Sequence, residues 1–452
     1  MNVRVVRPHR RRRPGVGIAG ALALTSCAPF AAHAGPVSAC SVTVASDAQV
    51  AAQHGFAALA PGSTVCIVPG TYAARLEIVG TTGTAAQPVT FEVRPATAPA
   101  RFTGGMLVRG AAYVSVSGLT VSLDPTTGPW AAVILDKGTH DAMVRGLTVQ
   151  HSFVGVALGS ADGPAGTGNS VVDNLVRGNW NTGIDVDTLS DGSAAAPNTV
   201  RRNRVLDNGG HGIEVNDANY IAILDNFVSG NSTGIHSVQQ GGYSGIHLYA
   251  SAASGASSPH GIRCSHDVIA SNTVQGTLQR PASEPCRDGS GTGVCADGNG
   301  IQVDRFCNSN DVHANVTRDN AGDGISLYGA SDNDVYGNYA RGDNQQADRR
   351  KLFPGPAEIA VSASGLPDGS ASGNRIHDNV AITTVNRLPA FYQSSNAGAN
   401  TVGPRNTWQW AAEADPGRSW GPVYIGSTWH ATAAGVDAAT RTRGNVVGAP
   451  PR

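Results

Sequence analysis

From Asn169 to Asn400 the chain repeats a short pattern of aliphatic, glycine and asparagine positions. The unit reads Val-x-x-Asn-x-Val, then a second corner rich in Asn and Gly, then Gly-Ile-x-Val/Leu and a turn into the next unit. Its first asparagine marks successive copies at Asn174, Asn203, Asn226, Asn272, Asn315, Asn338 and Asn379. Three of the six steps are short, at 23 or 29 residues, and the other three exceed 40, as expected for coils carrying inserted loops. Such a repeat predicts a solenoid of stacked coils.

The aliphatic positions of the Gly-Ile strands predict two buried ladders, because one coil cannot bury its own apolar edge. The first ladder is Ile184, Ile213, Ile235, Ile301 and Ile325. The second, two residues later on the same strand face, is Val186, Val215, Val303 and Leu327. The residue between each pair must point outward.

Asn-Gly pairs such as Asn208-Gly209 and Asn299-Gly300 stand between the predicted strands. We interpret them as corners that need positive φ, which Gly takes freely and Asn tolerates. A two-residue hairpin is the competing interpretation, but the flanking runs recur at coil spacing. The predicted fold is all-β, a right-handed parallel β-helix with a short N-terminal capping helix.

The repeat divides the chain into a few regions. A short amphipathic helix is expected from Ser46 to Leu59, capped by Asp47. The expected regions are a signal peptide at 1–34, a cap with first strands at 35–87, the β-helix at 88–404 with inserted loops at 237–261, 277–297 and 343–356, and a C-terminal cap or tail at 405–452. The tail carries four tryptophans, which suit a packed cap or a sugar-stacking platform: Trp408, Trp410, Trp420 and Trp429.

The first 34 residues are typical of an export signal, with a basic stretch at 10–13, an apolar stretch at 15–30 and a small-x-small site at Ala32-His33-Ala34. An alternative is a lipobox at 24–27, which would make Cys27 a lipidated N-terminus. We therefore expect a secreted or periplasmic protein, or an outer-membrane lipoprotein.

Composition narrows the function classes. The 452 residues include 57 Gly and only 14% charged residues, and the formal net charge is -1. This balance argues against a nucleic-acid partner, and no later segment is apolar enough to span a bilayer. We expect a monomer.

Six cysteines follow Cys27, and an even number in an exported chain points to disulfides. Cys40 and Cys66 are the pair near the N-terminus. Cys264 and Cys307 each precede the Val that opens a coil, so stacking would place them side by side, which leaves Cys286 with Cys295. Four cysteines allow three pairings.

Stacking would also align the outward positions of the Gly-Ile strands in one polar strip suited to a linear polymer. The strip comprises Asp185, Asp187, Glu214, Asn216, His236, Gln302, Asp304, Ser326 and Tyr328, and the inserted Gly-Ile-His-Leu-Tyr adds His247 and Tyr249. Any one such residue is more often a solvated or turn-bonded side chain than a catalyst. The strip as a whole is the candidate binding surface.

A family resemblance appears at residues 61–72, Pro-Gly-Ser-Thr-Val-Cys-Ile-Val-Pro-Gly-Thr-Tyr. After a short helix, this segment resembles the N-terminal cap of exported parallel β-helix proteins acting on polysaccharides, with the chondroitinase B and alginate lyase group most similar. The resemblance covers the cap and the repeats. It implies a lyase for an acidic polysaccharide, without a family-specific catalytic motif.

Cleavage of a uronic-acid polymer by β-elimination needs a base, an acid and neutralisation of the C6 carboxylate. His247 could be the base and Tyr249 the acid, two residues apart on one strand face. Arg305, or Lys137, could meet the carboxylate. Alternatively, Asp187, Glu214 and Asp304 could hold a calcium ion for that task.

Alternatives stay open. Parallel β-helix alginate epimerases carry Tyr-Gly-x-Asp-Pro-His-Asp; residues 182–187 and 211–217 match its acid after Gly-x but lack the Pro-His. A glycoside hydrolase could use paired carboxylates such as Asp185 and Glu214 on neighbouring coils. A non-catalytic glycan-binding or surface protein is the third possibility.

Overall fold

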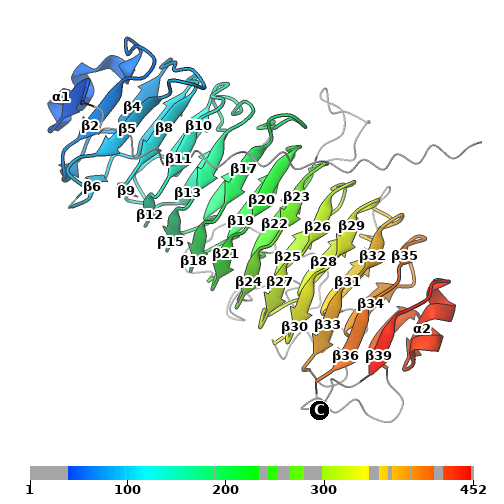
Figure 1. The fold of residues 1–452 in the computed structure, drawn as a ribbon. Coiled ribbons are helices and arrows are strands. Elements are labelled where there is room, and N and C mark those ends of the chain that lie inside the picture. Colours follow the sequence, from blue (N-terminus) through cyan, green and yellow to red (C-terminus); the bar gives the residue numbers. More distant parts are fainter. Residues whose placement is uncertain are drawn as a thin grey trace, which may run out of the picture. The chain divides into compact units, whose positions relative to one another are not determined.

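The computed structural model describes residues 39–96, 98–187, 189–233, 243–251, 264–278, 298–345, 356–364, 369–385, 388–411 and 421–448. These residues form a right-handed parallel β-helix in the unit Cys40–Arg452, and successive coils stack in chain order (Figure 1). Each coil contributes one strand to each of three sheets, here named A, B and C. The fold predicted from the repeat is confirmed.

Sheet A begins with the first described strand. Its strands in order are β1 (Val42–Val44), β2 (Thr64–Ile67), β5 (Val89–Val93), β8 (Val114–Ser117), β11 (Met143–Arg145), β14 (Ser170–Val172), β17 (Asn198–Arg201), β20 (Ile221–Leu224), β23 (Val268–Ala270), β26 (Asp311–His313), β29 (Asp334–Tyr336), β32 (Arg375–His377) and β35 (Thr401–Val402).

Sheet B follows sheet A in each coil. Its strands are β3 (Gly70–Tyr72), β6 (Ala100–Phe102), β9 (Leu119–Ser122), β12 (Thr148–Gln150), β15 (Leu175–Arg177), β18 (Arg204–Leu206), β21 (Phe227–Ser229), β24 (Thr273–Gln275), β27 (Val316–Arg318), β30 (Tyr339–Arg341), β33 (Val380–Thr383), β36 (Thr407–Trp410) and β39 (Val446–Gly448).

Sheet C closes each coil and holds the Gly-Ile strands. Its strands are β4 (Leu76–Val79), β7 (Met106–Arg109), β10 (Ala131–Asp136), β13 (Val154–Leu158), β16 (Ile184–Val186), β19 (Ile213–Asn216), β22 (Ile246–Tyr249), β25 (Ile301–Val303), β28 (Ile325–Tyr328), β31 (Ile359–Ser362), β34 (Phe391–Ser394), β37 (Val423–Gly426) and β38 (Thr428–His430). Among the pairings of the described strands, the final one, of β37 with β38, is antiparallel and the others are parallel. The strands thus extend on both sides of the 88–404 range predicted for the β-helix.

Two buried ladders line the inside of sheet C, as predicted, with one correction. Ile213 pairs with Ile246, which pairs with Ile301. Ile235 lies outside the described residues, and Ile246 occupies the place predicted for it. The range 237–261 therefore contains strand β22 and is not one continuous loop. The error arose because Gly-Ile occurs twice within this coil.

Asparagines form hydrogen-bonded ladders at the corners between strands. The Nδ2 of Asn203 donates to Oδ1 of Asn226 at 3.0 Å, and the Nδ2 of Asn226 donates to Oδ1 of Asn272 at 3.0 Å. Equivalent bonds run through Asn174, Asn203, Asn226, Asn272, Asn315, Asn338, Asn379 and Asn406. Each buried side-chain amide thereby forms hydrogen bonds with the amide and the backbone of a neighbouring coil.

These ladders correct our interpretation of the Asn-Gly corners. Among the described residues, positive φ falls on residues such as Arg202 and Asp225, directly before a ladder asparagine, and not on Asn208. The glycines are required by close approach instead. A Cβ on Gly209 would lie 2.0 Å from the carbonyl oxygen of Trp180.

The N-terminal helix is shorter than predicted. α1 spans Asp47–Ala52, and its N-cap is Ser46, whose Oγ accepts from the N–H of Gln49, rather than Asp47. A 3-10 turn, η1 (His54–Phe56), follows because Gly55 breaks the helix at φ 81°. Val50 and Phe56 join the main core cluster. Helix α2 (Ala433–Thr440) lies near the C-terminus, and neither helix is long and apolar enough to cross a membrane.

Two of the predicted disulfides are present, Cys40–Cys66 and Cys264–Cys307. The first joins β1 to β2, and the second ties the turns before β23 and β26. Cys286 and Cys295 lie outside the described residues. Among the tail tryptophans, Trp408 is fully buried against Phe391, with ring centroids 4.9 Å apart, whereas Trp420 is outside the described residues.

Candidate active site

Three rows of polar side chains cross the outer face of sheet C from β16 to β28. The middle row is Asp185, Glu214, His247, Gln302 and Ser326, consecutive partners in the strand register. A second row, three residues after each buried isoleucine, is Asp187, Asn216, Tyr249, Asp304 and Tyr328. A third, directly before each glycine, is Thr182, His211, Ser244, Asn299 and Asp323. Stacking in register therefore gathers the predicted strip.

His247 is the centre of this network. Its Nε2 lies 3.4 Å from Oδ2 of Asp304, and its Nδ1 lies 3.6 Å from Oε1 of Glu214. The side chain is 6% exposed, and Nδ1 has no hydrogen-bond partner among the described residues. Burial alone would lower the pKa of His247, but Asp304 and Glu214 outweigh it and raise the value to about 9. The ring therefore carries a positive charge at neutral pH.

His211 stacks on His247 in the opposite charge state. The ring centroids are 4.4 Å apart and the planes differ by 12°. The Nδ1 of His211 accepts a hydrogen bond from the backbone N–H of Ser244 at 2.9 Å, so the neutral ring holds its proton on Nε2, facing Glu214. Burial, opposed by Glu214, lowers the pKa of His211 to about 4.

Asp185 and Glu214 are register neighbours whose pKa values move apart. Burial first, then the charges of Glu214 and Asp187, raise the pKa of Asp185 well above its usual range. Burial would also raise the pKa of Glu214, but His211 and His247 lower it to about 2. A protonated carboxyl thus lies beside an ionised one, a pattern typical of acid and base pairs in enzymes.

Arg305 and Tyr249 form the polar pair at the edge of the network. The Nη2 of Arg305 donates to the phenol oxygen of Tyr249 at 3.2 Å, and the guanidinium carbon lies 5.6 Å from the ring centroid. The Nε of Arg305 is buried without a hydrogen-bond partner, and no described carboxylate forms an ion pair with this side chain. Its charge can therefore meet an incoming anion.

Gln302 is fully engaged within the protein. Its Oε1 accepts from Oγ of Ser244 at 2.9 Å and from Nδ2 of Asn299 at 2.7 Å. Its Nε2 lies 3.4 Å from Oδ2 of Asp304. Gln302 therefore orients Asp304, which in turn faces His247.

The donor geometry does not fit a shared metal ion. Ligand atoms of His211, Glu214 and His247 lie within 4.8 Å of one another. However, the lone pairs of two nearly parallel imidazoles run side by side and do not converge on one point. The predicted calcium set is not gathered either, because Glu214 and Asp304 face opposite nitrogens of His247 and Asp187 lies beside Asp185.

The other predicted residues lie at the edge of the network or away from it. Asn216 donates to Oδ1 of Asp185 at 3.2 Å, whereas Tyr328 is 40% exposed and bonds the carbonyl of Ser364. Lys137 follows β10, four strand pairings before β22 in the sheet, so it is not the partner of Tyr249. His236 lies outside the described residues.

Sequence reasoning missed the row before the glycines. His211 and Ser244 orient the central histidine, and Oγ1 of Thr182 donates to Oε2 of Glu214 at 3.1 Å. A signal was present, since a polar residue directly precedes Gly-Ile in five coils.

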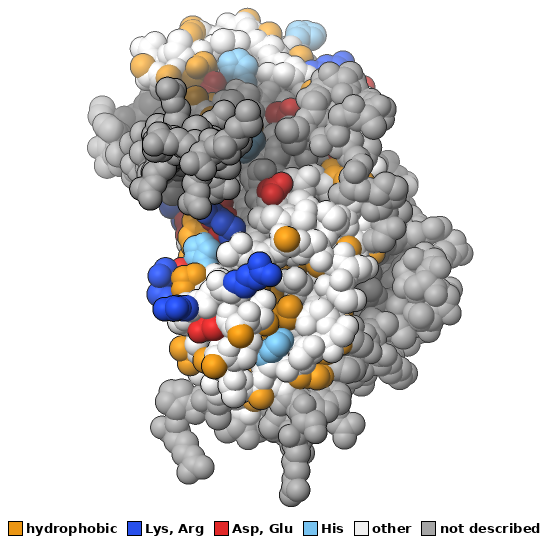
Figure 2. All heavy atoms as spheres, turned by 90° about the vertical axis from the view of Figure 1, so that its right-hand side faces the viewer, with side chains coloured by type: hydrophobic (Ala, Val, Ile, Leu, Met, Phe, Trp, Pro, Cys, Tyr) orange, Lys and Arg blue, Asp and Glu red, His pale blue; other side chains and the backbone are white. Residues whose placement is uncertain are grey.

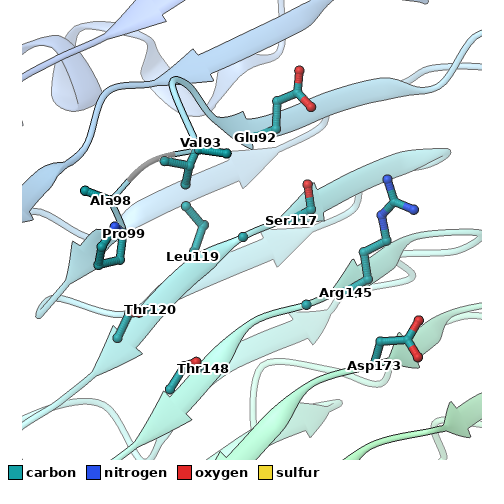
Figure 3. A pocket seen from close by; sticks show the side chains of 13 residues that line it. Glu92, Val93, Ala98, Pro99, Ser117, Leu119, Thr120, Arg145, Thr148 and Asp173 are labelled. Atoms are coloured by element: carbon teal, nitrogen blue, oxygen red, sulfur yellow. The ribbon is translucent and has the colours of Figure 1, made fainter. Parts of the chain in front are cut away.

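A separate open depression of ≈ 630 Å³ lies at the corner between sheets A and B, in the N-terminal half (Figure 3). It is lined by Glu92, Arg145 and Asp173 from sheet A and its turns and by Thr120 and Thr148 from sheet B. None of the three rows reaches it. Figure 2 shows one face of the molecule, with charged side chains of both signs scattered among neutral surface.

Comparisons with known proteins identify the fold. The family described as "Periplasmic copper-binding protein (NosD)" matches residues 105–250, about a third of the chain. No curated protein matches the sequence.

Three solved structures are similar. The Azotobacter vinelandii mannuronan C-5 epimerase AlgE6 A-module is 12% identical, covers 90% of this chain and 94% of its own, and gives a TM-score of 0.54. A mannuronic acid specific polysaccharide family 6 lyase from human gut microbiota is 14% identical, with 84% and 87% covered and a TM-score of 0.51. Dettilon tailspike protein (gp208) is 17% identical, with 84% and 64% covered and a TM-score of 0.50. These identities establish the parallel β-helix fold alone.

Proposed function

We propose that this protein is an exported polysaccharide-active enzyme that cleaves a uronic-acid polymer by β-elimination. The observation that carries the proposal is the Arg305–Tyr249 pair, in which a cation with no carboxylate partner among the described residues lies beside a phenol. Two of the solved structures similar in fold are a mannuronan C-5 epimerase module and a mannuronic acid specific polysaccharide lyase, which favours this substrate class. The two disulfides favour a location outside the cytoplasm.

The proposed chemistry assigns one task to each side chain. Arg305 binds the C6 carboxylate and withdraws charge from C5. The Tyr249 oxygen, which accepts a hydrogen bond from Arg305, acts as the base that removes the C5 proton. The C5–H electrons form the C4–C5 double bond, the C4–O bond breaks, and Tyr249 passes the proton that it took from C5 to the leaving oxygen. Retention of the C4–O bond with reprotonation at C5 would give epimerisation instead.

This assignment revises the roles expected for His247 and Tyr249. His247 holds its proton at neutral pH, so it does not suit the base. Its positive charge instead attracts the carboxylates of Glu214 and Asp304 and holds them in place. We propose that His247 positions Asp304, whose Oδ1 accepts the backbone N–H of Arg305 at 2.7 Å.

The test is incubation with a panel of linear polyuronates, followed by absorbance at about 235 nm, where the conjugated product of C5 proton removal absorbs. Wild type is expected to raise the absorbance on one polymer. Tyr249→Phe is expected to lose activity by on the order of 100-fold or more, whereas Tyr220→Phe, on sheet A, is the matched control. No absorbance with any polyuronate would refute elimination.

Glycosidic hydrolysis is the second candidate, favoured by the Asp185–Glu214 pair. Protonated Asp185 would donate to the leaving oxygen, and ionised Glu214 would act as nucleophile or base. Hydrolysis predicts new reducing ends without absorbance at about 235 nm and loss of activity in both Asp185→Asn and Glu214→Gln. Retained activity in either variant would exclude this mechanism.

A further inference from the structure

The outer face of sheet B has a composition unlike that of the other two sheets. Its thirteen strands contain no Asp or Glu, and their only charged residues are five exposed arginines: Arg101, Arg177, Arg204, Arg318 and Arg341. Strands of sheets A and C do carry acids, such as Asp311 and Glu214. In Figure 1 the strands of sheet B lie side by side along one edge of the solenoid, from β6 to β39.

Strand register arranges these outward residues in two straight rows. One row runs Arg101, Thr120, Thr148, Leu175, Arg204, Phe227, Thr273, Val316, Tyr339 and Val380. The other runs Ser122, Gln150, Arg177, Leu206, Ser229, Gln275, Arg318 and Arg341. The two rows therefore carry guanidinium groups at intervals among Thr, Ser and Gln side chains and half-buried apolar ones. The open depression at Thr120 and Thr148 adjoins the first row (Figure 3).

Neutral partners hold several of these arginines. The Nε of Arg177 donates to Oε1 of Gln150 at 3.1 Å, and the Nε of Arg318 donates to Oε1 of Gln275 at 2.7 Å. The Nη2 of Arg101 donates to Oγ of Ser122 at 3.1 Å. A neutral partner orients a guanidinium without cancelling its charge. Within the described residues, none of these three arginines forms an ion pair with a carboxylate.

The carboxylates near this sheet lie at its corners. Asp173 and Asp225 are paired with Arg202 and Arg201. Asp207 and Asp319 follow the last residues of β18 and β27. The face between these corners is therefore positive, although the net charge of the whole chain is -1. A local positive face on a nearly neutral protein concentrates anionic ligands there.

We infer that the outer face of sheet B binds a linear anionic polysaccharide as a second, non-catalytic site. Guanidinium groups pair well with carboxylates. Coils repeat every ~4.8 Å, so the four steps from Arg177 to Arg318 span ~19 Å, a scale suited to an extended polymer with repeated charges. Phe227 and Tyr339 offer apolar surface to sugar rings.

A lipid bilayer fits this face less well. Insertion needs protruding apolar side chains, whereas the aliphatic and aromatic residues between the arginines are half-buried. Among the described residues of sheet B, only Val446, at the C-terminal end, is a large hydrophobic residue counted as exposed. The inference rests on the proposed function for the polymer's identity alone, since the arginines are remote in sequence and sheet from Tyr249.

The experiment measures equilibrium binding in the full chain carrying Tyr249→Phe, so that the polymer stays intact. The ligands are sodium polymannuronate and polygalacturonate, with dextran as the neutral polymer and phosphatidylglycerol vesicles as the anionic lipid. The test variant is Arg177→Gln/Arg204→Gln/Arg318→Gln. The matched control is Arg201→Gln/Arg375→Gln/Arg405→Gln, which removes three charges from sheet A and the turn after β35. Thermal melts of both variants check the fold.

The inference predicts binding to at least one polyuronate and none to dextran. The sheet B variant is expected to bind roughly tenfold more weakly or worse, and the sheet A control within about twofold of the parent. Binding should also weaken as salt is raised. Equal affinity in both triple variants, absence of polyuronate binding, or binding to the vesicles alone would overturn the inference.

The outcomes separate this inference from the proposed function. Loss of polymer binding in the sheet B variant, with wild type inactive on every polyuronate, would support the binding face and reject the lyase. Turnover by wild type, with unchanged polymer binding in the sheet B variant, would support the lyase and reject the binding face.

Discussion

His211 and His247 stack with ring centroids 4.4 Å apart but hold opposite charge states at neutral pH. The difference follows from their partners. Burial lowers the pKa of His211, and among the flanking carboxylates only Glu214 lies close enough to oppose it strongly, whereas both Asp304 and Glu214 flank His247 and favour the cation. His211 is thus a neutral hydrogen-bond acceptor, and its neighbour His247 is a cation between two carboxylates.

We expect NMR of histidine-labelled protein to show His247 protonated up to a pH of about 9 and His211 neutral above about 4. The raised pKa of His247 adds stability below its unfolded value, and this contribution is lost as pH rises through about 9. Glu214→Gln should lower the pKa of His247, because one flanking charge is removed. Titration of both rings near pH 6.5 would contradict this picture.

Substitutions of Arg305 should show how much of the activity depends on its positive charge and how much on the planar shape of its guanidinium group. Arg305→Lys keeps a cation but loses the planar fork, so we expect a higher KM and a lower kcat on the polyuronate that wild type cleaves. Arg305→Gln should reduce kcat/KM by on the order of 100-fold. Arg375→Gln, on sheet A, serves as the control. If Arg305→Gln retains full activity, the guanidinium does not bind the reacting carboxylate.

Chelation should leave activity unchanged. Parallel imidazole planes do not converge on one ion, and the predicted calcium ligands Glu214 and Asp304 lie on opposite sides of His247. We expect the rate and the melting temperature to be the same in EDTA and in added Ca²⁺ or Zn²⁺. Loss of activity in EDTA that Ca²⁺ restores would show a site that this geometry does not display.

Asp343 replaces an asparagine in a corner ladder and makes stability depend on pH. Its Oδ1 accepts from Nδ2 of Asn320 at 2.7 Å, and its N–H bonds the buried carboxyl of Glu358. Burial raises the pKa of Asp343 to about 7 and that of Glu358 well above its usual range. Raised values favour the folded protein at low pH, and this stability is lost as pH rises from about 4 to about 7.

Asp343→Asn should therefore remove part of this pH dependence. We expect its melting temperature to exceed that of wild type by a few degrees at pH 8 and to differ less at pH 5. Asp311→Asn, on the partly exposed face of sheet A, is the comparison. Equal shifts at both pH values would argue that Asp343 is ionised in the folded protein throughout.

Removal of a ladder amide should destabilise the fold. Asn226→Ala deletes bonds to Asn203, Asn272 and the Val200 carbonyl and leaves buried groups unpaired. The expected cost is about 2 kcal/mol or more, measured by denaturant unfolding. Asn396→Ala, at an exposed turn, should cost much less. Similar losses in both variants would argue against a structural role for the ladder.

The repeat predicted the fold, the inward rows and two disulfides because each depends on spacing alone. Strand period places Ile213 inside and Glu214 outside whatever their partners are. The choice between Ile235 and Ile246 was not accessible, since both follow Gly and only coil geometry selects one.

The sequence predicted which side chains of the candidate site lie near one another but not their charge states. Register brought Asp185, Glu214 and His247 together as expected. Charge states, however, depend on which atoms face each other, and the role of Ser244 in fixing the His211 tautomer is a backbone contact that residue type does not reveal. The corner asparagines show the same limit. Asn is expected at a corner that needs positive φ and equally at one where the side-chain amide forms a ladder, so the residue type alone does not distinguish the two.

The asparagine ladders also allow the number of coils to change without changing how neighbouring coils contact each other. Asn315 and Asn338 are 23 residues apart and present the same amide to the coil above and the coil below. Deletion of residues 315–337 would remove one coil and place Asn338 where Asn315 stood. Both polar faces would become one strand shorter, and the cross-section of the solenoid would stay the same. A protein built this way can lengthen or shorten its polar faces by gaining or losing whole turns.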